Sequence, residues 1–339
     1  MSDSDAPLQS RARILTSTLP GWRILAAFLA CLVTAAAPAQ TYPSKAIRLI
    51  VRAPPGGTDD LIARLIAPAI SKTIGQQVIV DYRPGAGGLV AWEYIAKQPP
   101  DGYTMLLAAS GLAAIKTLRP GATLDPFKEI GWVTQVTDFM LALLVHPSLP
   151  VRNAAELIAL AKKRPGELSY GSSGIGATPH LSAEYFKSMA KVDMNHVPYK
   201  GAGPMYLDLF TGRIEVGAAV LGGALPHIRS GKVRPIGVSG AKRSPQAADV
   251  PTIAEEGLPG YAFEPFYALV VAAGTPPDTM NALAAIVAKA LTTPEFRAQF
   301  QKLVAAEIKV NTPEAMLQLA KKEAELIETI VRTAGIKLE

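Results

Sequence analysis

The chain has 339 residues, a formal net charge of +6, 49% hydrophobic residues and 18% charged residues. This composition indicates a folded globular protein and excludes a disordered one, and the length is enough for two domains of ordinary size. The mildly basic balance comes without a Lys/Arg block interleaved with aromatic residues, which argues against nucleic-acid binding.

The N-terminus has the organisation of a secretory leader. Three arginines, the last of them Arg23, precede an apolar run over Ile24–Val33, and small residues follow up to Ala39. This order predicts a signal peptide over residues 1–39, cut after Ala39, and therefore a periplasmic protein. The alternative, a membrane anchor, is disfavoured because a spanning helix needs about 20 apolar residues.

Cys31 is the only cysteine, and it lies inside the predicted leader. Leu29-Ala30-Cys31 loosely resembles a lipobox, but Phe28 fits that motif poorly, so lipoprotein anchoring at Cys31 ranks second. The predicted mature chain has no cysteine, which excludes disulfides and thiolate chemistry.

Strand-like and helix-like runs alternate after the leader, and this pattern predicts an α/β fold with a mostly parallel sheet. The first half predicts helices over Asp59–Ile74 and Gly88–Lys97, the first kinked or split at Pro68. Its predicted strands are Ile47–Val51, Gln77–Tyr82, Thr104–Ala108, Trp132–Val136 and Leu141–His146.

The second half repeats the alternation and ends in helices, so the chain is long enough for two α/β lobes with a ligand cleft between them. We expect lobe 1 over residues 40–142 and 238–339, and lobe 2 over residues 143–237. Predicted strands are Leu168–Ser172, Met194–Pro198, Ile214–Leu221 and Val233–Val238. Predicted helices are Asn153–Lys163, Pro179–Met189, Pro204–Leu209, Leu225–Ser230, Thr279–Leu291, Pro294–Leu303 and Pro313–Thr333.

A glycine loop follows the first strand and contains the candidate ligand residues Pro55, Gly56, Gly57 and Thr58. Glycines let a ligand approach the backbone, and the free N–H groups of the first helical turn favour an anion. Asp59 and Asp60 are interpreted as acids that favour the start of the helix rather than as ligand contacts.

A second loop with the same logic contains Ser172, Ser173, Gly174, Ala177, Thr178 and His180. If the lobes face one another, two helix N-termini point into one cleft and suit a carboxylate without any arginine. The alternative is that Thr178 caps its helix and the glycines only turn the chain. Ser110 and Tyr199 each follow a strand and are further candidates.

Catalysis has little support in the sequence. The four histidines lack metal-ligand spacing, and there is neither a dinucleotide fingerprint nor a Walker loop. Gly171-Ser172-Ser173-Gly174 fails as a nucleophile elbow because Ile175 stands where glycine is required. We expect no enzyme, no metal and no cofactor; a serine hydrolase using Ser172 or Ser173 with His180 is the least favoured alternative.

In combination and order, many short motifs resemble the Bug family, the substrate-binding proteins of tripartite tricarboxylate transporters. They are Pro55-Gly56-Gly57 with Asp60, Gly75-Gln76, Arg83–Gly88, Pro100–Thr104, Ser173-Gly174 with Gly176, His196–Gly201, Leu225–Ile228, Arg243–Pro245, Val250–Thr252 and Ala273–Pro276. The resemblance implies a two-lobe type II periplasmic-binding-protein fold. It also implies that the loops Pro55–Asp60 and Ser172–His180 hold a ligand carboxylate, partly through water, and that membrane transporter subunits are the partner.

The chain departs from the usual family residues at positions that bear on the ligand: Arg52 replaces Pro, Ala53 replaces Phe, Tyr82 replaces Asn, Ala219 replaces Asp and Phe266 replaces Trp. A polar contact at Ala219, which remains a candidate ligand-binding position, and an aromatic wall at Ala53 are therefore expected to be lost. The small residues suggest a larger or more apolar carboxylate.

The favoured hypothesis is a monomeric periplasmic protein that captures a small organic carboxylate and delivers it to a tripartite tricarboxylate-type membrane transporter. The same fold serving as the ligand-sensing input of a signalling receptor is the alternative.

Overall fold

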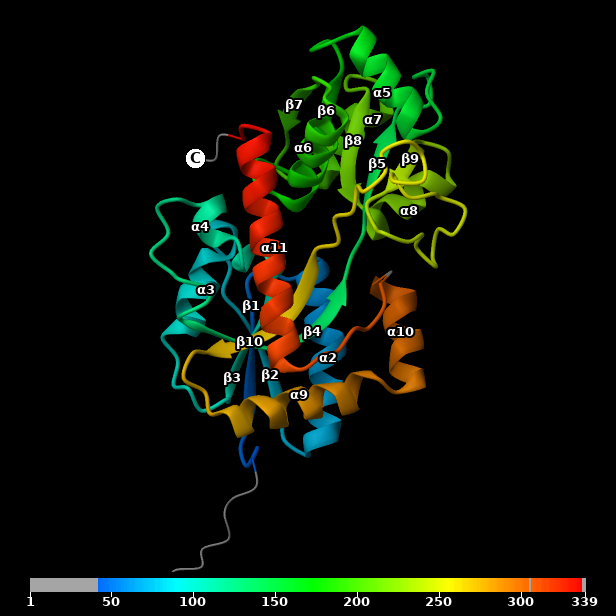
Figure 1. Ribbon diagram of the computed structural model, residues 1–339. Helices are drawn as coiled ribbons and strands as arrows, with labels where there is room; N and C mark the ends of the chain where they lie inside the picture. The colour runs from blue at the N-terminus through cyan, green and yellow to red at the C-terminus, as the bar shows by residue number, and fades with distance from the viewer. Residues whose placement is uncertain (1–41, 305, 337–339) are drawn as a thin grey trace, which may run out of the picture. The chain divides into compact units, whose positions relative to one another are not determined.

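Two five-stranded sheets are the framework of the computed structural model, which describes residues 42–304 and 306–336 (Figure 1). The predicted signal peptide and Cys31 lie outside the described residues. The first sheet has the order β2-β1-β3-β10-β4, formed by Val78–Tyr82, Ile47–Val51, Thr104–Ala109, Phe266–Ala272 and Ile130–Asp138. The second has the order β7-β6-β8-β5-β9, formed by Asn195–Pro198, Ser169–Ser172, Val216–Val220, Leu141–Val145 and Arg234–Val238.

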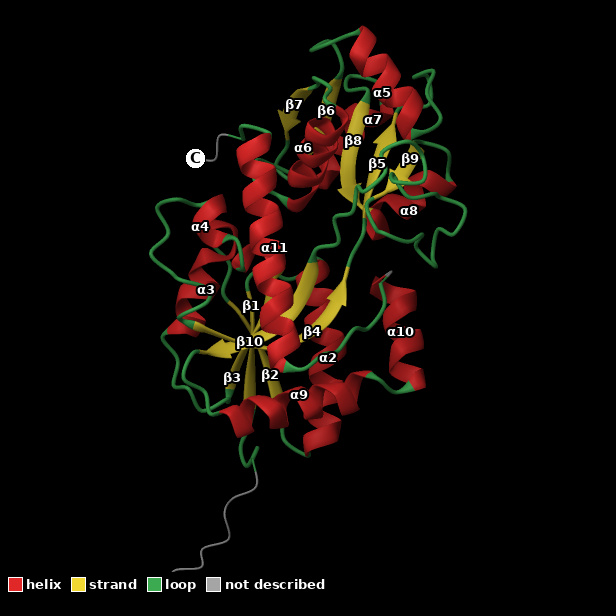
Figure 2. Cartoon of the chain, in the orientation of Figure 1, coloured by secondary structure: helices red, strands yellow, loops and turns green. Residues whose placement is uncertain are grey.

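Helices cover both sheets, so the fold is mixed α/β, as predicted (Figure 2). Those of the first lobe are α2 (Thr58–Ile74), α3 (Leu89–Ala96), α4 (Ile115–Leu118), α9 (Pro277–Leu291) and α10 (Pro294–Val304). Those of the second lobe are α5 (Ala154–Lys163), α6 (Thr178–Ala190), α7 (Ala202–Phe210) and α8 (Leu221–Arg229).

The last helix, α11 (Pro313–Thr333), packs against both lobes. Met316 and Ala320 join the apolar cluster of the first sheet, while Ile327 and Ile330 pack with Leu181 of α6 and with neighbouring residues. In Figure 1 this helix runs from beside the first sheet up to α6 of the second lobe and so crosses the boundary between them. It therefore couples the two lobes as well as completing the core of the first.

The strand directions correct the expectation of a mostly parallel sheet. β1 is parallel to β2 and β3, but β10 is antiparallel to β3 and β4, and β5 is antiparallel to β8 and β9. β10 was also not predicted as a strand. Two strands of one lobe become parallel when the chain returns through a crossover within that lobe. β5 and β10 are instead reached from the other sheet through the crossings between the lobes, so they need not run parallel to their neighbours.

Local capping follows the sequence closely. Asn153 accepts a hydrogen bond from the Glu156 N–H at 2.8 Å, and Thr312 accepts one from the Ala315 N–H at 3.3 Å, so both predicted helix starts are confirmed. Pro68 does not split α2, which continues from Thr58 to Ile74 with Pro68 on its exposed side.

The chain crosses between the sheets at residues 139–140 and 239–265, and these crossings are hydrogen-bonded to each other. Ser239 is fully buried; its hydroxyl donates to the Phe263 carbonyl at 2.6 Å and accepts from the Leu141 N–H at 2.9 Å. The Phe139 N–H donates to the Pro265 carbonyl at 2.9 Å.

The predicted domain limits fall within β5 and at the last residue of β9, and they stay a prediction. No helix within residues 42–304 and 306–336 is long and apolar enough to span a membrane.

Candidate ligand-binding site

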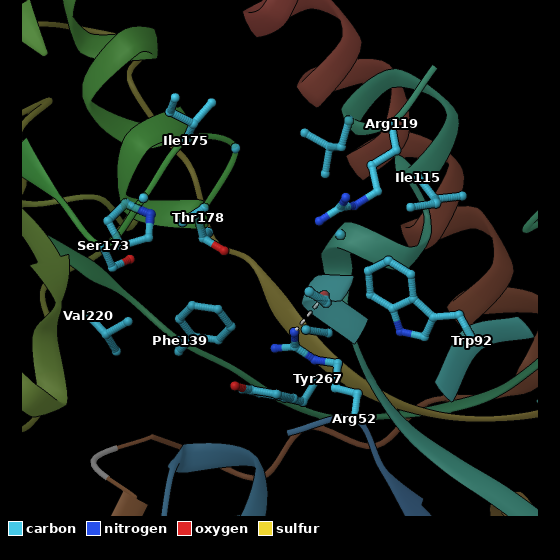
Figure 3. Close-up of a pocket in the computed structure, with 18 residues that line it drawn as sticks. Arg52, Trp92, Ile115, Arg119, Phe139, Ser173, Ile175, Thr178, Val220 and Tyr267 are labelled. Carbon is cyan, nitrogen blue, oxygen red and sulfur yellow. Dashed lines mark hydrogen bonds between the residues drawn. The ribbon is translucent and has the colours of Figure 1, made fainter. Parts of the chain in front are cut away.

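A cavity of about 560 Å³ lies between the two lobes, and residues of both sheets' connecting loops line it (Figure 3). The second lobe contributes the loop Ser173–Pro179 and Val220. The first lobe contributes Arg52, Trp92, Arg119 and neighbouring small or apolar residues, and Phe139 and Tyr267 lie beside them.

The second-lobe wall of the cavity is the loop that opens α6. β6 ends at Ser172 and α6 begins at Thr178, with Gly174 at φ +136° and Gly176 at φ +72° making the turn between them. The helix N-cap is Ala177, which makes no side-chain capping bond, so Thr178 is the first helical residue and not the cap. Of the predicted ligand residues, Ser173, Gly174, Ala177 and Thr178 line the cavity.

Three stacked rings support this loop from behind. His180 lies 4.1 Å from His196 and Tyr170 lies 4.8 Å from His196, both measured between ring centroids. His180 Nδ1 accepts the Gly176 N–H at 3.0 Å, and His196 Nε2 and Ser172 Oγ share a hydrogen bond at 2.7 Å. Burial lowers the pKa of His180 to about 4 and that of His196 to about 4. Both rings are therefore neutral at physiological pH, and a neutral Nδ1 can accept the loop N–H.

On the first-lobe wall, Arg52 is held in a fixed position by an acidic partner. Its Nε lies 2.9 Å from Asp59 Oδ1, and its Nη1 donates to the Gly87 carbonyl at 3.4 Å. Tyr267 also donates to Asp59, at 3.2 Å. Burial lowers the pKa of Arg52, but the charge of Asp59, the nearby Tyr267 and the hydrogen bonds with both together more than offset it, and the net shift is upward.

Arg119 is the second guanidinium in the cavity lining, and it follows directly after α4. Figure 3 shows its side chain reaching from α4 toward Thr178 on the facing wall. Within the described part of the chain, no carboxylate oxygen lies within ion-pair distance of it. The described lining contains these two arginines and no aspartate or glutamate.

The opening glycine loop lies beside this cavity rather than in its lining. Pro55, Gly56 and Gly57 are exposed, while Thr58 lines a smaller cavity of about 200 Å³ that shares Phe139, Val220 and Tyr267 with the larger one. A role for these four residues in binding the ligand stays a prediction.

Asp60 fixes the shape of that loop from the first turn of α2. It accepts the Gly56 N–H at 2.8 Å and Arg64 Nε at 2.6 Å, and Tyr82 also donates to it. These bonds lower the pKa of Asp60, the one from Tyr82 most. The replacement at Tyr82 thus has a structural explanation, since its hydroxyl anchors Asp60.

The remaining predicted residues do not line the cavity. Ser172 and His180 are buried behind the loop, and Ala219 is buried within β8. Tyr199 donates to Asp208 at 2.8 Å. Ser110 is buried beside Glu323 of α11, whose pKa burial raises to about 7 although the hydrogen bond with Ser110 pulls it down. Their part in ligand binding stays a prediction.

Sequence reasoning missed Arg52, Trp92, Arg119, Phe139 and Tyr267 in the lining, and it expected a carboxylate site without arginine. These side chains come from five separate segments, and no local motif marks them. The charged departure at Arg52, directly after β1, was the one available signal. The aromatic wall expected to be lost at Ala53 is supplied by Trp92, Phe139 and Tyr267 instead.

Among residues 42–304 and 306–336, no group of three or more His, Cys, Asp or Glu side chains is placed to hold a metal ion. The lining offers hydrogen-bond donors and positive charge, which are groups that bind an anion.

Two α/β lobes with a cavity between them are the architecture of periplasmic binding proteins, and solved structures of that class share the fold. R. palustris Rpa4515 with adipate is 36% identical, with a TM-score of 0.76, over 87% of this chain and 99% of that chain. MatC from Rhodopseudomonas palustris with bound malate is 28% identical, with a TM-score of 0.72, over 86% and 100% of the two chains. The periplasmic binding protein BugD is 27% identical, with a TM-score of 0.73, over 87% and 99%.

The chain belongs to the tripartite tricarboxylate transporter family of receptors, whose family model matches residues 62–336. Protein BugT of Bordetella pertussis is 34% identical over 309 residues, which are 91% of this chain and 94% of that protein. The resemblance to Bug proteins is thereby confirmed.

Proposed function

We propose that this protein is a periplasmic solute-binding protein that captures a small organic carboxylate for a tripartite tricarboxylate-type membrane transporter. The observation that carries the proposal is the described cavity lining, which has two guanidinium groups, a helix N-terminus and no acidic side chain. Family membership supports it, as do the adipate and malate held by two similar proteins.

The ligand carboxylate binds at the second-lobe wall, between Ser173 and Thr178. The N-terminus of α6 contributes the equivalent of about half a positive charge there, and Ser173 supplies a hydroxyl donor. Arg52 faces this wall from the first lobe with its guanidinium already positioned by Asp59. Contacts from both lobes favour the closed form, so binding shifts the population toward closure.

The protein works as a monomer outside the cytoplasm, after removal of residues 1–39, and presents its closed form to the transporter subunits. The basic and apolar pattern of the leader supports export. The family, a receptor family of transporters, supports the partner.

The protein performs no turnover. Among the residues that the structure describes near the cavity, one serine–histidine hydrogen bond is present, and it joins Ser172 to His196 rather than to the expected His180. Ser172 is fully buried and does not line the cavity. A serine nucleophile must reach its substrate, and these two facts argue against such a role.

Isothermal titration calorimetry with a panel of mono-, di- and tricarboxylates tests the proposal. We expect at least one of them to bind with a dissociation constant near 1 μM, about −8 kcal/mol, while neutral sugars do not bind. Thr178→Glu places a carboxylate on the second-lobe wall and is expected to abolish binding without a change in melting temperature.

Thr211→Glu is the matched control, since Thr211 is exposed after α7 and lines neither cavity. It should bind like the unaltered protein. Binding of sugars alone, or unchanged carboxylate affinity in Thr178→Glu, contradicts the proposed site.

A further inference from the structure

Arg119 differs from Arg52 in having no carboxylate partner among residues 42–304 and 306–336. Asp59 neutralises Arg52, and the cavity lining adds no further acid, so the described lining carries one uncompensated guanidinium. Arg119 is exposed, directly after the short helix α4, and its side chain points into the cavity rather than away from the molecule (Figure 3). An uncompensated guanidinium in a concave site favours a second anion.

Gly87 makes room for this guanidinium. Its backbone has φ +66°, and a Cβ built there would lie 2.7 Å from Arg119 Nη2, closer than non-bonded atoms approach. The carbonyl of Gly87 accepts from Arg52 Nη1 at 3.4 Å. One glycine therefore contacts both arginines, and any side chain at position 87 would displace Arg119.

Between Arg119 and the α6 wall the lining is largely apolar. Ile115 and Leu118 belong to α4, next to Arg119, and Ile175 stands on the facing loop with 49% of its surface exposed. Figure 3 shows Phe139 and Val220 on the side of Ser173, and Arg52 at the base between the two walls. The cavity thus combines a donor wall at α6, several apolar side chains and the Arg119 guanidinium on the opposite wall. A ligand that fits this sequence of surfaces has two anionic groups separated by a short apolar spacer.

We propose that Arg119 is a specificity-determining residue that binds the second anionic group of a dianionic ligand, with Gly87 leaving room for its guanidinium. This inference rests on the proposed carboxylate-binding function. Beyond that function, the inference requires a second negative charge on the ligand and assigns its binding to the Arg119 side chain.

The experiment compares straight-chain dicarboxylates, malonate through suberate, with their monomethyl esters, which keep the chain and lose one charge. The unaltered protein should bind at least one dicarboxylate about 10-fold or more tightly than its monoester, the strength of a hydrogen bond to a charged group. In Arg119→Gln this preference should disappear through loss of dicarboxylate affinity, while the monoester binds as before.

Two further variants separate the role of charge from general damage. Gly87→Ala keeps Arg119 but displaces it, and it should reduce the preference for the dicarboxylate as well. Arg229→Gln is the matched control, because Arg229 is also exposed, lies at the end of α8 and lines neither cavity; it should keep the full preference.

Equal affinity of the unaltered protein for dicarboxylates and monoesters overturns the role of Arg119 and leaves the proposed function intact. So does a preference that persists in Arg119→Gln. If neither dicarboxylates nor monocarboxylates bind the unaltered protein, the proposed function fails, and this inference fails with it.

Discussion

His180 connects the charge state of a buried ring to the shape of the binding loop. Its Nδ1 accepts the Gly176 N–H, which only the neutral ring can do, and its other neighbours are His196, Lys187 and the Glu184 that pairs with Lys187 at 2.8 Å. Burial lowers the pKa of His180 to about 4, with Lys187 adding to the effect. Because the pKa of His180 is lower in the folded protein than in the unfolded chain, the unfolded chain binds more protons at pH values between the two.

We therefore expect His180 to contribute a fall in the free energy of unfolding as the pH drops from 6.5 toward 4, the range bounded by its ordinary and its folded pKa, while Glu323, whose pKa burial raises to about 7, contributes in the opposite direction. In His180→Phe the first contribution is lost, so the free energy of unfolding should fall less toward low pH than in the unaltered protein. Urea denaturation followed by circular dichroism across this range measures it.

The control for the pH experiment is His146→Asn, because His146 lies outside the ring stack and contacts Ser148 instead. It should keep the full dependence on pH. An equal slope in His180→Phe and the unaltered protein would show that the ring stack does not control this window.

At the scale of elements, α11 is the structural link between the lobes. Its N-terminal half packs through Met316 and Ala320 on the first sheet, and its C-terminal half packs through Ile327 and Ile330 on residues that include Leu181 of α6. The spacing of these apolar positions places them on one face of the helix. The helix can therefore shift against α6 during closure only if Ile327 and Ile330 repack.

Ile327→Ala removes a side chain that is 1% exposed, and the cavity left behind is expected to cost about 2–5 kcal/mol of unfolding free energy. Glu328→Ala, on the exposed side of the same turn, should change it by less than about 0.5 kcal/mol. Urea denaturation of the three proteins tests this, and equal midpoints would contradict a role for Ile327 in joining the lobes.

At the scale of the whole molecule, the two crossings of the chain form one hydrogen-bonded hinge. The Ser239 hydroxyl joins Phe263 of the second crossing to Leu141, the first residue of β5. Phe139 of the first crossing, which lines the cavity, donates its N–H to Pro265 of the second. Because Phe139 belongs to the hinge and also lines the cavity, a ligand that contacts Phe139 is coupled directly to bending of the hinge.

Saturation with a carboxylate that binds should lower the radius of gyration in small-angle X-ray scattering, because closure about this hinge brings the lobes together. The same measurement with the matching neutral diamide should give the curve of the free protein. Identical curves for free and carboxylate-saturated protein would contradict a closing mechanism.

The local part of this architecture could be predicted from the sequence. The strand, glycine loop and helix around Ser173–Thr178 lie next to one another in the chain, so sequence alone places them on one wall of the cavity. Arg52 and Arg119 could not be assigned in this way. In the sequence Arg52 stands at the end of a predicted strand, and Arg119 is marked only by the proline that follows it. The fold brings both side chains beside Gly87.

β10 shows the same limit at the scale of a strand. Its seven residues are all buried and show no alternation, and the 239–265 crossing before it contains no helix or strand that would mark its position. The partner strands β3 and β4 lie more than a hundred residues earlier. No pattern in the sequence near any of the three strands indicates that β10 pairs between them.

The position of β10 also has a consequence for the order in which the protein acquires its structure. All strands of the second sheet come from the continuous stretch 141–238, but the first sheet stays divided between β3 and β4 until residues 266–272 emerge. As the chain appears N-terminus first, the later-encoded lobe can reach its native pairing before the earlier one. Until then the first half of the chain keeps unpaired strand edges at β3 and β4, which makes it the segment most dependent on protection from aggregation during synthesis and export.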